Sequence, residues 1–320
     1  MATQAKPAIS VRNLLPLFDR LSAPTYGILG IAALVTATLG RLLGYSLGET
    51  FDLSVPALCV FIIAIGAMLR RAGHRRIATC CETIALVYLQ GVLFIALLII
   101  LTGISAPFAD AKLVAIDRAF GFDWLALVRW SASQPTLLKV LDFAYRAFVW
   151  ESLAVFTLLA FLGAHRRSYQ AVLASLLALC FVCLIYPFCP AEGGFVYFGL
   201  RPADFAILHS NAPWEFAPVI HKIKGGAKVI EGAMEVGLVS FPSYHCAAAI
   251  ILTWAVWRTW LRIPALLLNS LMIFAALIFG AHYLIDVIGG AALAAASLPL
   301  AGVLLSRQKG EADAAPVSGG

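Results

Sequence analysis

Long apolar stretches separated by short polar segments run along most of the chain. A helix needs about 20 mostly apolar residues to cross the hydrocarbon core of a bilayer. The pattern therefore predicts an all-α, polytopic bundle of about eight transmembrane helices, at residues 26–47, 52–69, 77–103, 140–164, 170–190, 242–260, 263–281 and 283–305.

Two longer segments between the spans have patterns of their own. In 107–139, the apolar residues Leu113, Ile116 and Phe120 recur at spacings of three and four among aspartates. This spacing predicts helices that lie on the membrane interface. The segment 191–241 is rich in Gly and Pro and is too long for a simple connection, so we expect a functional lid or entrance there.

These segments predict how the chain is divided. We expect an N-terminal cytoplasmic segment at 1–25 and a single membrane-embedded domain at 26–305, in which the motifs described below occupy about 105–295. Residues 306–320 are mostly small and polar, which predicts a disordered cytoplasmic tail.

Composition excludes a water-soluble enzyme. Apolar residues make up 62% of the 320 residues and charged residues only 12%, whereas a soluble domain has about 45–50% and about 25%. The net charge of +6 does not indicate a nucleic-acid partner, because the basic residues form short clusters between apolar stretches. In a membrane protein that pattern indicates orientation.

The basic clusters predict the topology. Thirteen of the 23 Lys and Arg residues lie before the first span, after the second, fourth and eighth, or between the sixth and seventh. Eight crossings place all of these segments on one side, which the positive-inside rule makes the cytoplasm. We therefore expect a multi-pass protein of the cell (inner or plasma) membrane, with 104–139 and 191–241 outside.

Three polar residues at the predicted membrane boundary are candidates for chemistry, because ionisable groups at membrane depth are costly. His282 and Asp286 are four residues apart, which on a helix places them on one face. The carboxylate then accepts the proton of one ring nitrogen, fixes the tautomer, and makes the histidine a better nucleophile or base. His245 precedes His282 by 37 residues, about two membrane crossings, so both histidines are expected at the outer face.

The residues before His245 fit the start of a helix. Pro242 suits a first helical turn, and Ser243 can cap the helix or bind an anion there. A single histidine at an interface is usually a tolerated amphipathic residue, but two at one depth, one with a carboxylate, favour chemistry. Two other uses stay open: a zinc site, for which no third ligand has a suitable spacing, and a non-enzymatic transporter or proton relay.

These motifs resemble a known family. Pro242-Ser243-x-His245 followed by His282-x-x-x-Asp286 resembles the second and third motifs of the type 2 phosphatidic acid phosphatase superfamily. The His-Tyr-x-x-Asp form followed by Gly289-Gly290 is similar to the branch of inositol phosphorylceramide synthases and sphingomyelin synthases. The segment 110–124 also resembles bacterial members of that branch.

The resemblance implies a role for each motif residue. His282 would attack phosphorus and carry a phosphohistidine, Asp286 would orient it, and His245 would protonate the leaving oxygen. No metal or other cofactor is implied, and the partner is a phospholipid or lipid phosphate in the membrane.

The chain departs from the broad phosphatase pattern at its cations. Ala276 and Gly194 occupy positions where that pattern has Arg and Lys. Since a cation should neutralise the transferring group, Arg201 and Arg146 are candidate phosphate ligands beside Ser243. Their alternatives are a solvated loop residue for Arg201 and a side chain that snorkels to the interface for Arg146.

The form of the last motif and the missing arginine favour one reaction. We expect a lipid phosphotransferase, similar to inositol phosphorylceramide synthase, that moves a phosphate-bearing headgroup between lipids. The alternative is a lipid phosphate phosphatase, which hydrolyses phosphatidic acid or an isoprenoid phosphate, and the further alternative is the transporter or proton relay.

Overall fold

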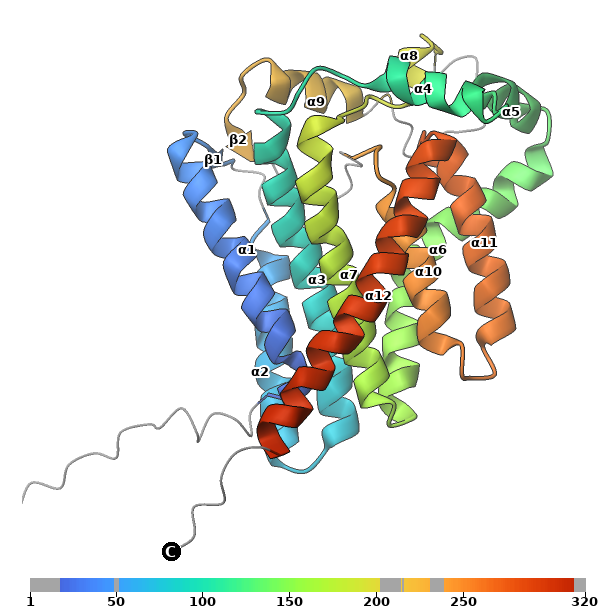
Figure 1. The fold of residues 1–320 in the computed structure, drawn as a ribbon. Helices are drawn as coiled ribbons and strands as arrows, with labels where there is room; N and C mark the ends of the chain where they lie inside the picture. Colours follow the sequence, from blue (N-terminus) through green and yellow to red (C-terminus); the bar gives the residue numbers. More distant parts are fainter. Residues whose placement is uncertain (1–17, 49–51, 202–213, 215, 231–238, 314–320) are drawn as a thin grey trace, which may run out of the picture.

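The computed structural model describes residues 18–48, 52–201, 214, 216–230 and 239–313. Long helices run side by side as one bundle, with short helices across one end (Figure 1). The bundle helices are α1 (Ala23–Leu42), α2 (Ser54–Arg71), α3 (Arg75–Thr102), α6 (Pro135–Phe161), α7 (His165–Ile185), α10 (Tyr244–Val256), α11 (Arg262–Phe279) and α12 (Leu284–Asp313).

The predicted all-α membrane bundle is confirmed. Within the described residues, seven helices are long and apolar enough to cross a membrane. The chain is therefore a multi-pass membrane protein, although the predicted count was about eight.

The difference from eight lies in the stretch predicted as 242–260. There the helix α10 has only 13 residues, about 20 Å at 1.5 Å per residue, which is shorter than the roughly 30 Å of a hydrocarbon core. Ser243 caps its first turn, and the chain turns soon after Val256. Apolar composition alone does not reveal these early ends.

The short helices cover one end of the bundle, which we call the histidine end because it holds His245 and His282. They are α4 (Asp110–Ala119), α5 (Trp124–Ala132), α8 (Gly194–Tyr197) and α9 (Phe216–Lys224). Helices α4 and α5 confirm those predicted within 107–139. The 3-10 turns η2 (Arg20–Ser22) and η3 (Tyr186–Phe188) and a parallel pair of two-residue strands, β1 (Ser46–Leu47) and β2 (Val229–Ile230), complete the described elements.

Helix α7 lies at the centre of the bundle and contacts α3, α10 and α12. Every residue from 171 to 179 on it is buried. A helix that is apolar on all sides is stable only when protein or lipid surrounds it, and here other helices do so. Helix α7 runs from one end of the bundle to the other (Figure 1).

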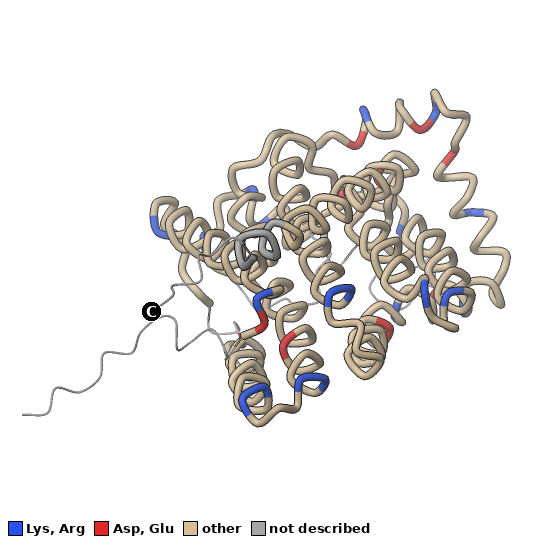
Figure 2. Tube along the Cα trace, turned by 60° about the horizontal axis from the view of Figure 1, so that its bottom comes forward, with Lys and Arg blue, Asp and Glu red and all other residues tan. Residues whose placement is uncertain are grey.

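Charged residues gather near the ends of the helices and leave long uncharged stretches between them (Figure 2). The end opposite the histidine end is rich in arginine, and we call it the arginine end. Its described residues include Arg70, Arg75, Arg166, Arg167 and Arg258.

Parts of the predicted division fall outside the described residues. These are 1–17 of the N-terminal segment, 314–320 of the tail, and 202–213, 215 and 231–238 of the predicted lid. Helix α12 continues to Asp313, which lies within the segment predicted as a tail.

Candidate active site

His282 lies in the short link between α11 and α12, immediately before the helix rather than within it. The expectation that His282 and Asp286 share a helical face is therefore wrong. The chain reaches His282 through Ala281, whose φ of 52° is in the left-handed region, and the His282 N–H donates to the Ala276 carbonyl at 3.2 Å. This turn, not helical spacing, brings the ring to the carboxylate.

The predicted pairing nevertheless forms. His282 Nδ1 lies 3.4 Å from Asp286 Oδ2, and both side chains are buried. Hydrogen bonds of this kind are often long in an unliganded site and tighten when substrate binds. With Nδ1 facing the carboxylate, Nε2 is the ring nitrogen left for chemistry.

Asp286 is held by several donors. Its Oδ2 atom accepts hydrogen bonds from the Ser240 hydroxyl at 2.7 Å and from the Tyr283 N–H at 2.8 Å. Asp286 also lies in the first turn of α12, where the helix dipole favours a negative charge. Its Oδ1 atom is buried and has no hydrogen-bond partner within the described residues. The carboxylate is thus fixed in one orientation toward His282.

His245 faces the same site from the first turn of α10. The centres of the His245 and His282 rings are 6.2 Å apart. Tyr145 of α6 stacks on His245 at 4.7 Å and 25°, and Phe148 meets its edge at 5.7 Å. Two aromatic side chains therefore restrict the orientation of this imidazole.

Ser243 caps the helix that carries His245 and so helps to position this histidine. Its hydroxyl accepts the Cys246 N–H at 3.4 Å as the N-cap of α10, which is the predicted capping role. Its own N–H donates to the Asp286 carbonyl at 3.0 Å. The start of α10 is thereby tied to the start of α12. Pro242 lies just before the cap and is not in the first helical turn.

Two glycines let these helix starts approach each other. A Cβ atom on Gly289 would lie 3.0 Å from Pro242 Cβ, and one on Gly290 would lie 2.2 Å from the Ser243 carbonyl oxygen. Because a side chain at either position would meet the start of α10 or the residues just before it, the Gly-Gly pair of the last motif sets the spacing between the histidine-bearing segments.

Two aspartates of α4 fix the link that carries His282. Asp117 accepts the N–H groups of Leu284 and Ile285 at 2.8 and 2.9 Å and so caps α12. Asp110 accepts the Tyr283 hydroxyl at 2.8 Å. Both carboxyls are buried. Burial raises the pKa of each above its usual value, and these hydrogen bonds offset only part of that rise.

Sequence reasoning did not assign these two aspartates a role. A usable signal was their spacing of seven residues, which places both on one face of a helix. Asp110 also accepts the N–H groups of Glu192 and Gly193, each at 3.1 Å, so one carboxylate joins α4, the segment before α8 and the histidine link.

The indole of Trp124 explains one departure from the phosphatase pattern. A Cβ atom on Gly194 would lie 2.6 Å from this ring. The Trp124 Nε1–H donates to the Leu277 carbonyl at 2.9 Å, and the ring meets Phe195 edge-on at 5.0 Å. Position 194 therefore has no space for the lysine that the broad pattern places there.

The predicted phosphate ligands lie in different settings. Arg146 Nε is 2.9 Å from both carboxylate oxygens of Asp142 on the same helix, and it follows Tyr145, which stacks on His245. Arg201 is exposed and borders the undescribed residues 202–213. Their binding of phosphate stays a prediction. Within the described part of the chain, no three His, Cys, Asp or Glu side chains form a group that could hold a metal ion.

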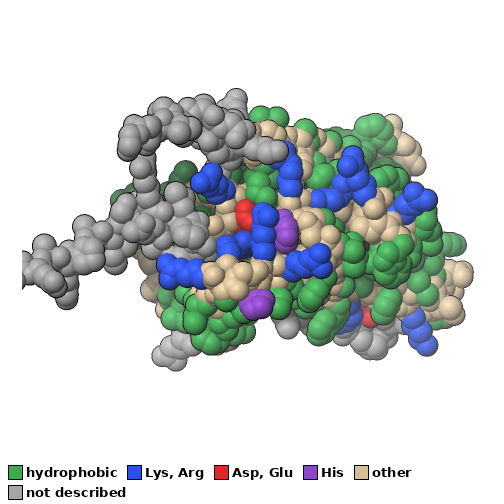
Figure 3. Space-filling view, turned by 90° about the horizontal axis from the view of Figure 1, so that it is seen from below, with side chains coloured by type: hydrophobic (Ala, Val, Ile, Leu, Met, Phe, Trp, Pro, Cys, Tyr) green, Lys and Arg blue, Asp and Glu red, His purple; other side chains and the backbone are tan. Residues whose placement is uncertain are grey.

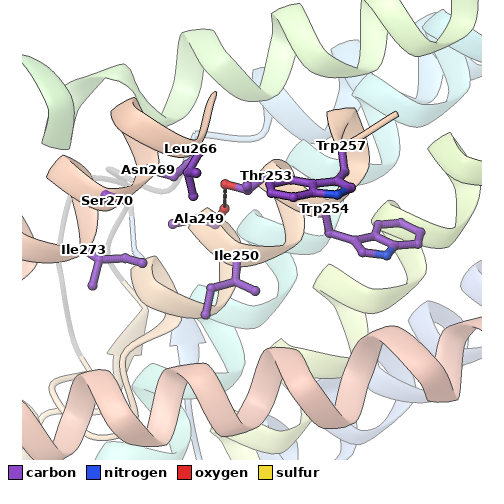
Figure 4. A pocket seen from close by; sticks show the side chains of 9 residues that line it. All are labelled: Ala249, Ile250, Thr253, Trp254, Trp257, Leu266, Asn269, Ser270 and Ile273. Atoms are coloured by element: carbon purple, nitrogen blue, oxygen red, sulfur yellow. Dashed lines mark hydrogen bonds between the residues drawn. The ribbon is translucent and has the colours of Figure 1, made fainter. Parts of the chain in front are cut away.

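An apolar pocket lies between α10 and α11 (Figure 4). Its volume is about 350 Å³. Ala249 and Thr253 line it at four and eight residues after His245, so they share a helical face with it. The lining residues come from α10 and α11: Ala249, Ile250, Thr253, Trp254, Trp257, Leu266, Asn269, Ser270 and Ile273.

Comparison with known proteins identifies the family. A family model described as the PAP2 superfamily matches residues 111–300, which is more than half of the chain and includes both histidine motifs. No curated protein and no solved structure matches. The match does not resolve the branch, but membership suggests a phosphatase or phosphotransferase. This multi-pass membrane protein belongs to the PAP2 superfamily.

Proposed function

We propose that the protein is a metal-independent lipid phosphotransferase that works through a phosphohistidine on His282. The observation that supports this most strongly is the convergence of Asp286, His282 and His245, with one carboxylate, one oriented imidazole and a second imidazole 6.2 Å away. Such a set supplies a nucleophile, its orienting partner and a general acid.

In the first half-reaction, Nε2 of His282 attacks the phosphorus of a phospholipid. A P–N bond forms and the P–O bond to the lipid alcohol breaks, while His245 gives its proton to the leaving oxygen. Asp286 holds the Nδ1 proton of His282 and stabilises the positive charge that develops on the ring.

In the second half-reaction, an acceptor hydroxyl attacks the same phosphorus. His245, now neutral, takes the proton of that hydroxyl, a new P–O bond forms, and the P–N bond to His282 breaks. The phosphate-bearing headgroup moves from one lipid to another, and the enzyme returns to its starting protonation state. Water in place of the lipid alcohol gives the alternative reaction, hydrolysis of a lipid phosphate.

The apolar pocket of Figure 4 supports a lipid as substrate. It begins one helical turn along α10 from His245 and is lined mainly by apolar and aromatic side chains. A bound lipid with its phosphorus between the histidines would place an acyl chain along this face of α10. Arg146 and Arg201 are the proposed cations for the phosphate oxygens.

The direct test incubates the purified protein with a phospholipid labelled in its headgroup phosphate and with candidate lipid alcohols. We expect the label to appear in a new lipid. Release of labelled phosphate without a new lipid contradicts transfer and supports the phosphatase. Substrate flux into proteoliposomes without any phospholipid turnover would support the transporter instead.

We also propose that the histidine end faces the outside of the cell, on the strength of the basic clusters at the arginine end. A cysteine replacing the exposed Lys112 of α4 should react with an impermeant maleimide in intact cells, and one replacing Arg75 should not. The comparison requires a parent without the seven natural cysteines. The reverse pattern would place the site in the cytoplasm.

A further inference from the structure

The arginine end contains a second cavity, of about 720 Å³. No described residue that lines it is acidic. Its polar lining includes His165 and four arginines: Arg75, Arg166, Arg167 and Arg258. Seen from this end, the molecule shows basic side chains gathered around histidine (Figure 3). Four cations around one hollow favour an anionic ligand.

The first turn of α7 forms part of the cavity wall. Residues 163–167 all line it, and α7 begins at His165 without a side-chain cap. The first N–H groups of a helix have no partner within it and carry partial positive charge, so they bind phosphate groups readily. Independently, the Nδ1 atom of His165 is buried and has no hydrogen-bond partner within the described residues.

Two of the arginines are held in place by neighbouring helices. Arg166 donates to the Ser306 hydroxyl at 2.9 Å. Arg167 donates to the carbonyls of Trp254 and Ala255, and its guanidinium lies 4.3 Å from the centre of the Trp254 ring. A ligand would therefore meet side chains that are already ordered, which reduces the entropy lost on binding.

The other two arginines, like Arg166, are exposed to solvent. Arg258 is exposed, and the Arg75 side chain is 57% exposed while it pairs with Asp19 at 3.1 Å. Asp19 also pairs with Arg70 at 3.0 Å. One aspartate thus offsets part of this charge, and the cavity lining stays strongly positive.

The cavity also has an apolar wall, formed by Leu21, Leu159, Leu162 and Trp254. A free phosphate ion has no group to place against such a wall. The glycerol and first acyl carbons of a phospholipid do, and basic pockets between transmembrane helices are known to bind anionic headgroups.

The cavity is separate from the catalytic site. Ser306, which binds Arg166, lies 22 residues after Leu284, where α12 begins two residues beyond His282. At 1.5 Å per residue this is over roughly 30 Å, about the thickness of the hydrocarbon core. We propose that this cavity binds the phosphate of an anionic phospholipid in the leaflet opposite the catalytic histidines.

The test uses the full-length protein in detergent and measures the Kd for dihexanoyl phosphatidylglycerol by microscale thermophoresis. Replacing Arg258 by Gln should raise this Kd about fivefold, the effect expected for one basic residue at an anionic surface. R166Q should act in the same direction. Because Arg258 is exposed, its replacement should leave the fold intact.

The matched control is R71Q, which removes an exposed arginine from the same end but outside the cavity. It should change the Kd less than twofold. Ligand bound at the histidines would contribute equally in both variants, so their difference reports on the cavity. The readout needs no turnover, which separates this inference from the proposed reaction.

Three results would overturn the inference. Equal losses in R71Q and R258Q would indicate diffuse attraction to a basic surface. Dihexanoyl phosphatidylcholine binding as tightly as phosphatidylglycerol would show that the charge is not recognised. Inorganic phosphate competing at the same concentration as the lipid would make this a site for a soluble anion.

Discussion

The two ends of the bundle use charge in opposite ways. At the histidine end, buried carboxylates accept hydrogen bonds: Asp117 caps α12, Asp110 holds Tyr283, and Asp286 faces His282. At the arginine end, guanidinium groups donate to hydroxyls and helix carbonyls around an open cavity. The first arrangement fixes the orientation of the imidazole that we propose as the nucleophile, whereas the second lines a cavity with positively charged side chains.

The arginine end also contains a buried structural cluster. Arg70 of α2 pairs with Glu82 of α3 at 2.6 Å and donates to the Tyr169 hydroxyl of α7 at 2.9 Å. Removing one member would leave buried charge without its partner, which is strongly destabilising. The buried Arg70 therefore holds helices together, whereas the arginines that line the cavity are the ones we propose to bind an anion.

The largest effect should follow from separating the two histidine segments. Gly290→Ala places a methyl group where Ser243 carbonyl oxygen would be 2.2 Å away, so α10 and α12 must move apart. We expect a loss of about 3 kcal/mol in stability, the upper part of the range for overpacking, together with loss of turnover. Thermal unfolding and activity assays measure both.

Gly91→Ala is the matched control for this change, because a Cβ atom there would meet nothing within 4 Å. In α3 it should be neutral or slightly stabilising, since Ala favours a helix over Gly. Equal destabilisation by both substitutions would contradict the role given to Gly290.

A large effect on rate with little effect on the fold should follow from Asp286→Asn. The amide oxygen can occupy the Oδ2 position and keep the bonds from Ser240 and Tyr283, while the NH2 group takes the position of the unpartnered Oδ1. Without the negative charge, His282 is a weaker nucleophile, and we expect turnover to fall about 10²–10⁴-fold.

The control for this loss is Asp123→Asn at the same end of the bundle. Asp123 caps α5 by accepting the Ala126 N–H, and Asn caps a helix about as well as Asp. Turnover should be unchanged. Unchanged turnover in Asp286→Asn would show that its charge has no part in the reaction.

The effect of His245→Ala should depend on the leaving group. With a lipid alcohol as leaving group, loss of the general acid should cost about 10²–10⁴-fold in rate. With an activated aryl phosphate, whose leaving oxygen needs no proton, much of that loss should disappear. An equal loss on both substrates would make His245 a phosphate-binding residue instead.

The smallest effect should come from Tyr283→Phe, which removes one hydrogen bond to Asp110. Asp110 keeps its bonds from Glu192 and Gly193, so we expect a stability loss of about 1 kcal/mol and a modest fall in turnover. Tyr26→Phe, which removes a 3.1 Å bond to Glu82 at the arginine end, should lose similar stability without affecting catalysis. Equal effects on turnover would contradict a specific role for Tyr283.

Much of this structure follows from patterns that are local in the sequence. Apolar stretches predicted the long helices, and the spacing of Leu113, Ile116 and Phe120 predicted the helices across the histidine end. The 37 residues between His245 and His282 predicted that both lie at one depth, and their rings are 6.2 Å apart. Two helices joined by a short turn leave little freedom for another arrangement.

The remaining features depend on contacts between distant residues. Tyr283 and Asp110 are 173 positions apart, and no periodicity connects them. The placement of His282 before α12 depends on the turn at Ala281 and on the cap from Asp117. The contact of Gly194 with Trp124 likewise requires the fold before it can be recognised.

The most direct test of the central claim is capture of the covalent intermediate. The protein is mixed with a phospholipid labelled in its headgroup phosphate, quenched in base, where phosphohistidine survives, and mapped by mass spectrometry. The label should be found on His282 in the parent protein and be absent in His282→Ala. Label on another residue, or turnover by His282→Ala, would contradict the assignment of His282 as the nucleophile.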